Sequence, residues 1–525
     1  MICPKRNKPV KAVKPDITIR RVKEILNVIG CNAEIYDSSI SASTFYSYHL
    51  ILYKENNPIF RCNGKGMTPE LALGSAYGEL MERLQNLHFY MATIYHSEIE
   101  NVNCSLYDES DFKYSPDEQI FTVEKLVCNS LQLLQNLFLM NNINKSDMIS
   151  YLKNQLKWDR MICVPFLNIK TKEKHFLPFR FIQWIVGSNG MCAGNTSEEA
   201  LIHGISEIFE RAVLKRIYLN PFTPPDIPLE LFSGNLIFEK IKQLEQSENL
   251  RIVIKDCSLG KELPVIGILV FSDDNLTYTF HLGADPNPIT ALERCFTELF
   301  QGGHPPFHAV PSSNYKAEKT VSSFWQQQLH HSILSYSGQL PSKFLAKTPD
   351  YAFRGFPYEI SDSDRQDLDW LIQLIKKLGQ QILVRNTGFL GFPSYYLYIP
   401  GMSEITNAID NRFVEQLAAF EQQLPLFFKI RNVLPEKRLE IVKLIKNFEK
   451  ASYSGEFDSS VYFKHCQNTP IAQMKSHEII SVLQNGRVPD NQPNCFECSE
   501  CKISDCSFLS MSSLWQTLKK FSYRN

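Results

Sequence analysis

The sequence predicts a mixed α/β (α+β) protein made of repeated strand–loop–helix units, with a smaller, mostly helical region towards its C-terminal end. Three observations support this fold class. Short runs of alternating apolar and polar residues, typical of strands, precede segments with helical spacing. One helical template occurs three times, and from about residue 411 the pattern is helical. At 525 residues the chain is long enough for one large body and a smaller appendage.

The composition is that of an ordinary globular protein, with 44% hydrophobic and 12% aromatic residues. Its 55 basic and 56 acidic residues nearly cancel, so overall charge indicates no nucleic-acid partner. Residues 1–14 are basic but lack the apolar run of an export signal, and apolar stretches such as Leu263–Phe271 are only strand-sized. We therefore expect a cytoplasmic protein with no membrane span and no direct nucleic-acid contact, whose 14 cysteines are mostly reduced.

The N-terminal third alternates between helix and strand patterns. Ile17–Gly30 carries apolar residues at helical spacing and stops at a glycine, which predicts a helix. Strands are expected at Ser47–Tyr53 and Pro58–Cys62, where the alternation is rich in aromatic residues. The first copy of the repeated helix follows at about Pro69–Tyr90. The polar segment Ser97–Lys157 has no clear period, so we expect it to be irregular.

Strand patterns and two further copies of the helix occupy the rest of the body. The helices are expected at about Ser197–Tyr218 and Pro288–Gln301. The predicted strands are short apolar runs at Met161–Ile169, His175–Phe179, Arg251–Asp256, Pro264–Phe271, Thr277–Leu282, Gln380–Asn386 and Tyr395–Ile399. Further along the chain, helical spacing is clearest at Arg412–Gln423 and Glu436–Lys450.

The repeated helix has one template, in which a capping residue is followed by an alanine four residues later and a glutamate seven residues after that. The three copies are Thr68–Ala72–Glu79, Thr196–Ala200–Glu207 and Asn287–Ala291–Glu298. Threonine and asparagine cap the free amides of a helix start, and Thr196 with Glu199 fits a capping box. A short glycine-containing loop is expected before each cap. Such a loop exposes backbone amides that favour phosphate.

Within each copy, polar residues three and four apart share one helix face. The three stripes are Ser75, Glu79 and Glu82; His203, Glu207 and Glu210; and Arg294, Glu298 and Gln301. A single glutamate pair is usually a solvated face, and Glu82–Arg83 or Glu210–Arg211 alone could be surface ion pairs. Three copies of one template instead favour a shared site.

If the stripes converge, five glutamates meet, and their charges require cations. Mg²⁺ takes oxygen ligands and is commonly shared between carboxylates and phosphates. The predicted magnesium ligands are Glu79, Glu82, Glu207, Glu210 and Glu298. Lys65, Arg211 and Arg294 are then expected to meet the phosphates. The residues thus predict a magnesium–nucleotide site that is not a P-loop, because the P-loop motif is absent.

The same segments resemble the ATP-binding motifs of the YcaO family over roughly residues 45–405. The matching stretches are Asn63–Gly66 with Ser75–Arg83, Ser188–Ala200 with Ser206–Arg211, and Ala291–Gly302. The resemblance implies a fold of the family's own kind, ATP and Mg²⁺ as cofactors, and ATP-dependent activation of a peptide backbone amide. It also implies that the nucleotide contacts are Lys65, Ser75, Asn195, Glu199, Arg211 and Arg294, while the five glutamates hold magnesium. Cys192 departs from the small polar residue usual at its position.

Within the family, Ser188–Thr196, Glu293–Gly302 and Pro400–Ile405 look most like the enterobacterial member. That member is implicated in β-methylthiolation of an aspartate in ribosomal protein S12, as an accessory to a methylthiotransferase. Azoline-forming members end in a proline-rich tail, which Phe521–Asn525 lacks. The resemblance therefore implies S12 and a methylthiotransferase as partners and a homodimer as the assembly. The C-terminal region departs from the enterobacterial protein.

The implied organisation is a basic lead-in without fixed structure at 1–14, a YcaO domain at 15–410, a helical region at 411–490 and a cysteine-containing tail at 491–525. The leading hypothesis is an ATP-dependent, amide-activating enzyme. A non-catalytic ATP-binding scaffold and a thioamide- or azoline-forming peptide modifier remain alternatives. No residue is assigned as the catalytic group, although His203 is a candidate base on the second stripe.

The tail contains four closely spaced cysteines, Cys495, Cys498, Cys501 and Cys506, in the pattern C-x₂-C-x₂-C-x₄-C. Four thiolates at such spacing can hold zinc or an iron–sulfur cluster. The spacing differs from the ferredoxin run, and tight C-x₂-C-x₂-C strains closure around one zinc. A reduced tail or a thiol relay therefore remains the alternative.

Overall fold

The computed structural model describes the main body of the chain and short pieces towards its end. The described residues are 11–39, 45–86, 117–155, 160–301, 307–310, 322–358 and 361–405, with gaps at 139, 141, 180–181, 183–184, 261 and 336–337, together with 476–485 and pieces between 438 and 446 and between 513 and 521. The predicted helix Arg412–Gln423 and the four tail cysteines lie outside these residues, as does almost all of Glu436–Lys450.

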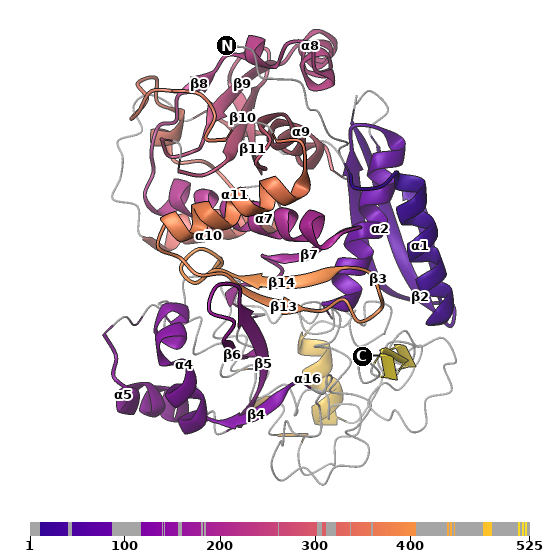
Figure 1. The fold of residues 1–525 in the computed structure, drawn as a ribbon, viewed down its shortest axis with the longest axis vertical. Helices are drawn as coiled ribbons and strands as arrows, with labels where there is room; N and C mark the ends of the chain where they lie inside the picture. The colour runs from indigo at the N-terminus through magenta and orange to yellow at the C-terminus, as the bar shows by residue number, and fades with distance from the viewer. Residues whose placement is uncertain are drawn as a thin grey trace.

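Three antiparallel sheets organise the described chain (Figure 1). The first, of order β1-β2-β3, contains β1 Cys31–Asp37, β2 Tyr46–Lys54 and β3 Asn57–Gly66. The second, of order β4-β5-β13-β14-β7 with β6 on β5, contains β4 Gln119–Thr122, β5 Arg160–Asn168, β6 Lys174–Pro178, β7 Met191–Ala193, β13 Leu383–Asn386 and β14 Ser394–Tyr398. The third, of order β12-β11-β10-β9-β8, contains β8 Asp226–Ile227, β9 Arg251–Asp256, β10 Val265–Phe271, β11 Thr277–Ala284 and β12 His308–Ala309.

Helices connect and cover these sheets. The α-helices are α1 Pro15–Val28, α2 Pro69–Gln85, α4 Val123–Leu137, α5 Lys145–Ser150, α7 Ser197–Leu219, α8 Leu236–Glu248, α9 Pro288–Leu299, α10 Ser322–Ser335, α11 Asp364–Lys377 and α16 Ser476–Asn485. Shorter turns of helix occur at Tyr151–Gln155, Leu229–Phe232 and Ser342–Leu345. In the part of the chain that is described, no helix combines the length and the apolar character needed to cross a bilayer.

The three repeated helices close a ring of sheets. α2 follows β3 and packs on its own sheet and on β7 and β14 of the second sheet. α7 follows β7 and packs on β7 and β14 and on β10 and β11 of the third. α9 follows β11 and packs on β10 and β11 and returns to β3 of the first. Each helix thus bridges its own sheet to the next one, and the polar stripes face a common centre.

Three apolar clusters fill the junctions of this ring. One joins the first and second sheets around Tyr77 and Leu80 of α2, and a second surrounds α7 at Ile205 and Phe209. The third joins α9 to the first sheet. There Phe45 stacks on two rings of the α9 segment, Phe296 and Phe300, with centroids 5.5 Å away in each pair. This burial is the main force that holds the three helices in place.

Each repeated helix begins at the predicted cap. The side chains of Thr68, Thr196 and Asn287 accept backbone N–H bonds from Leu71, Glu199 and Ile289, at 3.3, 3.1 and 2.9 Å. The reciprocal bond of the predicted capping box does not form, because the Glu199 carboxylate accepts from Asn195 instead. The three helices therefore start where their caps predict.

The predicted glycine loops before these caps are wrong for two of the three copies. Gly64–Gly66 is the end of β3, and Gly283 with Ala284 is the end of β11. A side chain on Gly64 would lie 2.2 Å from the carbonyl oxygen of Ala72, and one on Gly283 would lie 2.2 Å from that of Ala291. The glycines let the strand approach the first turn of its helix closely.

The second copy reaches the same close packing by exchanging the two sides of the contact. Cys192 occupies the strand position that corresponds to Gly64 and Gly283, and Gly204 of α7 faces it. A side chain on Gly204 would lie 2.8 Å from the Cys192 sulfur. The small residue has moved from the strand to the helix, which explains why a cysteine fits at position 192.

The other predicted elements agree with the structure to different extents. The mixed α/β class is confirmed, and the strands predicted from Met161 to Ile399 all form, with ends shifted by a few residues. The segment Ser97–Lys157 is not irregular over its described part, which contains β4, α4 and α5. Helices α8, α10 and α11 were not predicted, because their apolar positions are interrupted by long polar side chains.

Candidate functional site

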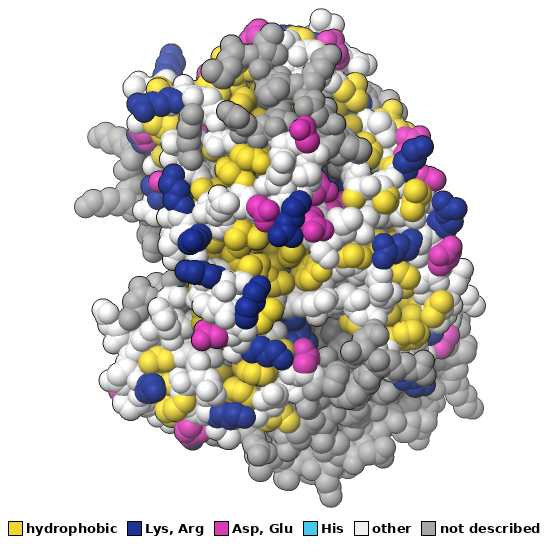
Figure 2. Space-filling view, in the orientation of Figure 1, with side chains coloured by type: hydrophobic (Ala, Val, Ile, Leu, Met, Phe, Trp, Pro, Cys, Tyr) yellow, Lys and Arg dark blue, Asp and Glu magenta, His cyan; other side chains and the backbone are white. Residues whose placement is uncertain are grey.

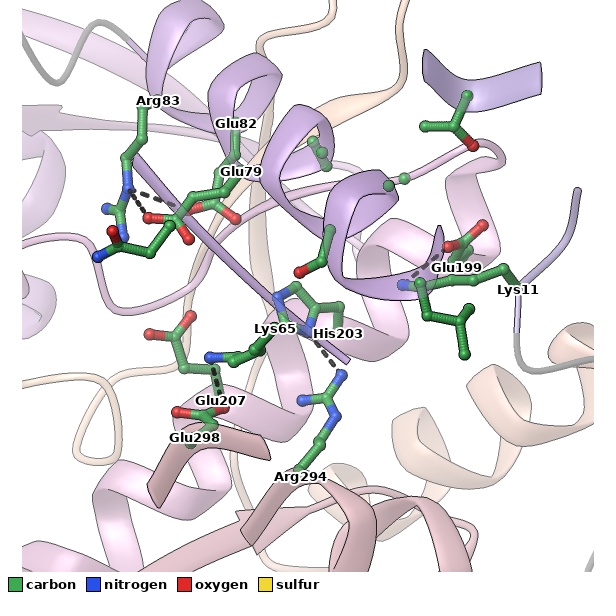
Figure 3. A pocket seen from close by; sticks show the side chains of 18 of the residues that line it. Lys11, Lys65, Glu79, Glu82, Arg83, Glu199, His203, Glu207, Arg294 and Glu298 are labelled. Atoms are coloured by element: carbon green, nitrogen blue, oxygen red, sulfur yellow. Dashed lines mark hydrogen bonds and ion pairs between the residues drawn. The ribbon is translucent and has the colours of Figure 1, made fainter. Parts of the chain in front are cut away.

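A cavity of about 380 Å³ lies where the polar stripes of α2, α7 and α9 meet (Figure 3). Its lining includes all eleven nucleotide and magnesium residues that the sequence predicted for the body: Lys65, Ser75, Glu79, Glu82, Asn195, Glu199, Glu207, Glu210, Arg211, Arg294 and Glu298. These residues come from all three strand–helix units. The two that are farthest apart in the sequence, Lys65 and Glu298, are separated by 233 positions. The four tail cysteines lie outside the described residues.

Two basic side chains, Lys65 and Arg83, form ion pairs with three of the carboxylates in the cavity. Lys65 on β3 lies with its Nζ 2.9 Å from Oε1 of Glu298 on α9. Arg83 of α2 lies 3.7 Å from Glu79 and 3.6 Å from Glu82. These ion pairs leave two of the five predicted magnesium ligands without a basic partner.

Glu207 and Glu210 are the two predicted magnesium ligands that have no such basic partner. Neither carboxylate forms a hydrogen bond or an ion pair within 4 Å with any residue of the described chain, although both line the cavity and Glu210 is only 4% exposed. An ionised carboxylate out of water is unfavourable without a partner. This unpaired charge in a cavity with oxygen donors fits a divalent cation such as Mg²⁺.

The pKa values reflect the same imbalance. Burial raises the pKa of Glu82 and that of Glu210 to about 8, and it also raises the pKa of Glu207. Burial raises the pKa of Glu298 as well, but the neighbouring basic groups, first Lys65 and then His281 and Arg211, together outweigh burial and lower it to about 2. The cavity therefore contains carboxylates that basic and polar neighbours keep ionised, Glu298 and Glu199, and others that need a cation to ionise fully at neutral pH.

Arg294 is oriented by two neighbours. Its Nη2 lies 2.6 Å from Nδ1 of His203, and its Nε lies 4.0 Å from Asp285. Because an arginine only donates, the Nδ1 atom of His203 accepts, and the ring is neutral. Burial, followed by the charge of Arg294, lowers the pKa of His203 well below its usual value, in agreement with that assignment. His203 is thus placed to orient Arg294 rather than to act as a free base.

The N-terminal segment contributes residues that the sequence patterns did not single out. Lys11 lies with its Nζ 3.1 Å from Glu199, and Thr18 of α1 donates its hydroxyl to Asn195 at 2.8 Å. Both line the cavity, although residues 1–14 were predicted as a lead-in without fixed structure. A lone lysine in a basic segment gives no signal of its target, so only the fold brings it to the site.

Cys192 makes no contribution to the cavity wall. It is fully buried, and its thiol donates to the carbonyl oxygen of Tyr395 at 3.6 Å. The neighbouring Ala193 and Gly194 line the cavity instead. The departure at position 192 therefore lies in the packing between β7 and α7 and not in the cavity wall.

The fold and the site together define a protein with a cavity, lined by carboxylates and basic side chains, at the centre of three strand–helix units. The sequence pattern of the family described as "YcaO cyclodehydratase, ATP- and Mg²⁺-binding" matches residues 63–403. This match covers more than half of the chain, and the protein belongs to the YcaO family.

Two curated relatives are similar to this chain over most of its length. An uncharacterised protein of Haemophilus influenzae is 28% identical over 398 residues, which cover 75% of this chain and 65% of the relative. The ribosomal protein S12 methylthiotransferase accessory factor YcaO of Escherichia coli is 29% identical over 412 residues, which cover 77% of this chain and 67% of the relative. The matched region thus spans about two thirds of each relative.

Solved structures with a similar fold include two proteins with bound molecules. A heterocyclase in complex with substrate and cofactor has a TM-score of 0.47 and 17% identity, over 77% of this chain and 54% of that protein. YcaO from Methanopyrus kandleri, bound with AMPPCP and Mg²⁺, has a TM-score of 0.44 and 15% identity, over 76% of this chain and 94% of that protein.

Charged side chains of both signs lie on the described surface. On the face drawn in Figure 2, Lys and Arg side chains and Asp and Glu side chains are both scattered over the described part, with several Lys and Arg side chains gathered left of the centre. This mixture agrees with the formal net charge of −1 for the whole chain.

Proposed function

We propose that this protein binds Mg–ATP in the central cavity and uses it to activate a backbone amide of a peptide substrate. The observation that carries the proposal is the convergence of the three polar stripes, with Glu207 and Glu210 left without a direct cation among the described residues. Membership of a family described as ATP- and Mg²⁺-binding supports the same assignment. The volume of about 380 Å³ is within the range of nucleotide-sized pockets.

The residues divide the work by charge. Glu79, Glu82, Glu207, Glu210 and Glu298 hold magnesium, which when bound neutralises phosphate charge and polarises the transferred phosphoryl group. On the nucleotide, Lys65, Arg211 and Arg294 meet phosphate oxygens, and Ser75, Asn195 and Glu199 donate to or accept from its polar groups. Lys11, beside Glu199, adds a further positive charge at the rim.

A second cavity gives the acceptor peptide a place to approach. It has a volume of about 220 Å³ and meets the first one at Lys65, His203, Arg294 and Glu298. Its wall is more apolar, with Met67, Leu71, Ile202 and Leu236. The amide oxygen of a peptide held there would reach the phosphates at the shared residues, where positioning and charge neutralisation supply most of the rate.

We propose ribosomal protein S12 as the substrate protein, with this chain acting as an accessory factor for β-methylthiolation of its aspartate. The support is the 29% identity to the Escherichia coli protein of that name. Deleting the gene and weighing intact S12 tests this role. A missing methylthio mass is expected, and an unchanged mass would remove S12 from the proposal.

ADP release tests the chemistry separately from the partner. The purified protein is expected to release ADP from Mg–ATP faster when S12 is added, and Glu207→Gln is expected to abolish the release. Binding of Mg–ATP without any release, with or without S12, would instead favour an ATP-binding scaffold for the methylthiotransferase. Release with an unrelated peptide but not with S12 would favour a thioamide- or azoline-forming role.

A further inference from the structure

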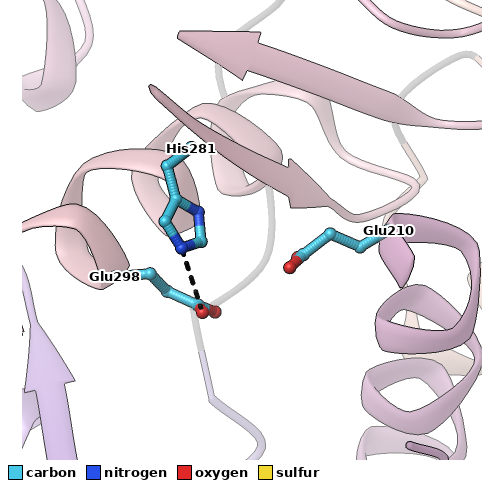
Figure 4. A group of neighbouring side chains, drawn as sticks. All are labelled: Glu210, His281 and Glu298. Atoms are coloured by element: carbon cyan, nitrogen blue, oxygen red, sulfur yellow. Dashed lines mark ion pairs between the residues drawn. The ribbon is translucent and has the colours of Figure 1, made fainter. Parts of the chain in front are cut away.

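Three side chains from three different elements meet on one side of the cavity (Figure 4). Glu210 is on α7, His281 is on β11 and Glu298 is on α9. The closest ligand atoms of the three all lie within 4.8 Å of one another, and all three side chains are buried. His281 is not one of the five predicted magnesium ligands, so its position beside two of them needs a separate explanation.

The ring of His281 is held with one nitrogen turned towards the carboxylates. Its Nδ1 lies 2.6 Å from the carbonyl oxygen of Leu282, which can only accept, so Nδ1 carries the proton. The other nitrogen, Nε2, lies 3.9 Å from Oε2 of Glu298 and presents its lone pair to the group. A neutral imidazole fixed through Nδ1–H on a backbone carbonyl is the usual arrangement of a metal-binding histidine.

The two oxygens of Glu298 are divided between two tasks. Oε1 pairs with Lys65, and Oε2 faces His281. Glu298 can therefore bind an ion through Oε2 without losing its contact with Lys65. Glu210 is 4% exposed, points towards the other two in Figure 4, and forms no hydrogen bond or close ion pair with a described residue.

The separations match a metal ion better than a direct contact. Ligands about 2.1 Å from one ion in tetrahedral or octahedral geometry lie about 3 to 4 Å apart. The distance of 3.9 Å between Nε2 and Oε2 is in this range and is too long for a hydrogen bond. The three ligand atoms lie within 4.8 Å of one another, so an ion bound by all three requires them to draw together by roughly 1 Å.

We propose that Glu210, His281 and Glu298 bind one first-row transition-metal ion, with Nε2 of His281 as its nitrogen ligand. Imidazole suits zinc, iron, copper and nickel, and the two carboxylates also suit manganese, whereas Mg²⁺ takes oxygen ligands. The cavity then holds two kinds of cation: magnesium at the all-oxygen carboxylates with the nucleotide, and a transition metal at this mixed site. This metal site rests on the proposed function only because it shares Glu210 and Glu298 with the magnesium ligands proposed there. The transition-metal ion binds without ATP.

Manganese provides the test, because its paramagnetism reports directly on its ligands. The purified full-length chain, stripped with EDTA and free of nucleotide, is titrated with Mn²⁺ alone and examined by pulsed electron paramagnetic resonance. We expect a bound ion coupled to one imidazole ¹⁴N. His281→Gln keeps a side chain of similar reach but removes the ring, and is expected to abolish this coupling and to weaken Mn²⁺ binding by about tenfold or more.

His203→Asn is the matched control, because His203 is a histidine that lines the same cavity as Glu210 and Glu298 but is not one of the three proposed ligands. It is expected to keep the ¹⁴N coupling. Bound Mn²⁺ without nitrogen coupling in the wild-type chain, or coupling that survives His281→Gln and disappears in His203→Asn, would overturn the proposal.

A competition on the wild-type chain keeps the test decisive even if His281→Gln does not fold. Zn²⁺ at stoichiometric concentration is expected to displace the bound Mn²⁺, and Mg²⁺ is expected to need about a hundredfold more. Equal displacement by the two ions would contradict the assignment. None of these readouts needs ATP turnover, so a failed metal site and a failed amide-activating function give different results.

Discussion

Lys65 and Glu298 form an ion pair of 2.9 Å that joins the first strand–helix unit to the third across the cavity. Lys65 also reaches Gln301, with its Nζ 3.4 Å from the side-chain oxygen. The ammonium lies among carboxylates that are otherwise short of positive charge. It therefore partly neutralises the cavity before any ligand arrives, and it lies where a phosphate would meet it.

This pairing predicts opposite stability effects at two glutamates of the same cavity. Without metal, Glu210→Gln is expected to raise the free energy of unfolding by about 1 kcal/mol, because it removes a buried carboxylate with no close partner. Glu298→Gln is expected to lower it by about 2 kcal/mol, because Lys65 loses its counter-ion. Urea unfolding in EDTA at neutral pH measures both. A stabilising Glu298→Gln, or a Glu210→Gln that destabilises as strongly, would contradict this distribution of charge.

The metal-free protein is also expected to lose stability as the pH rises from about 7 to 8. Burial raises the pKa of Glu82 and of Glu210 from 4.5 to about 8, so between these values the folded chain holds protons that the unfolded chain has released. Stability therefore falls with rising pH, by at most about 2.7 kcal/mol per pH unit for both groups together.

Urea unfolding in EDTA at several pH values measures this dependence, and the same series with excess Mg²⁺ is the control. With Mg²⁺ the slope is expected to flatten, because a bound cation favours the ionised carboxylates. Stability that rises from pH 7 to 8 without metal would show that these two carboxylates are not held protonated.

The contact between His203 and Arg294 predicts a defect in binding that a small change can rescue. His203→Leu removes the acceptor that lies 2.6 Å from Nη2 of Arg294, and KM for ATP is expected to rise about tenfold. His203→Asn restores an acceptor close to the position of Nδ1 and is expected to recover most of the affinity. ADP-release kinetics measure both variants. If His203 were instead a general base, kcat would fall in both variants with KM unchanged.

The close packing of β3 on α2 predicts a sharp difference between two glycines. Gly64→Ala would place a methyl group 2.2 Å from the carbonyl oxygen of Ala72 and 2.4 Å from the amide nitrogen of Ala76, so it should cost about 3 kcal/mol or more. Gly78→Ala, on α2 itself, would place a methyl group with no atom within 4 Å and should raise the free energy of unfolding by up to about 1 kcal/mol. Thermal and urea unfolding compare the two. A mild Gly64→Ala would mean that the strand and helix are less tightly packed.

The sequence predicted most of what local chemistry determines. Thr68, Thr196 and Asn287 cap helices in the structure because a short polar side chain followed by helical spacing is a local signal. The convergence of the stripes was predicted from a repeat, since three equal units that bury their apolar faces must direct their polar faces to one side. Glu79 and Glu207 are therefore at the cavity, as expected.

Contacts between residues far apart in the sequence could not be predicted from these local patterns. His281 is a single histidine in a buried strand, and only the approach of α7 and α9 makes it part of a group. Lys11 reaches Glu199 across 188 positions of sequence, which no local pattern encodes. Gly64–Gly66 was expected to be a loop because glycine is common in turns, whereas here it permits close contact between a strand and a helix.

The central claim is that three separate helices form one magnesium–nucleotide site. Isothermal titration with a non-hydrolysable ATP analogue and Mg²⁺ tests it most directly, on the wild-type chain and on one variant per helix: Glu79→Gln, Glu207→Gln and Glu298→Gln. Each variant is expected to lose at least about tenfold in affinity while its circular dichroism spectrum stays unchanged, because each removes a ligand from the same ion cluster. Wild-type affinity in any one of the three folded variants would contradict a single shared site.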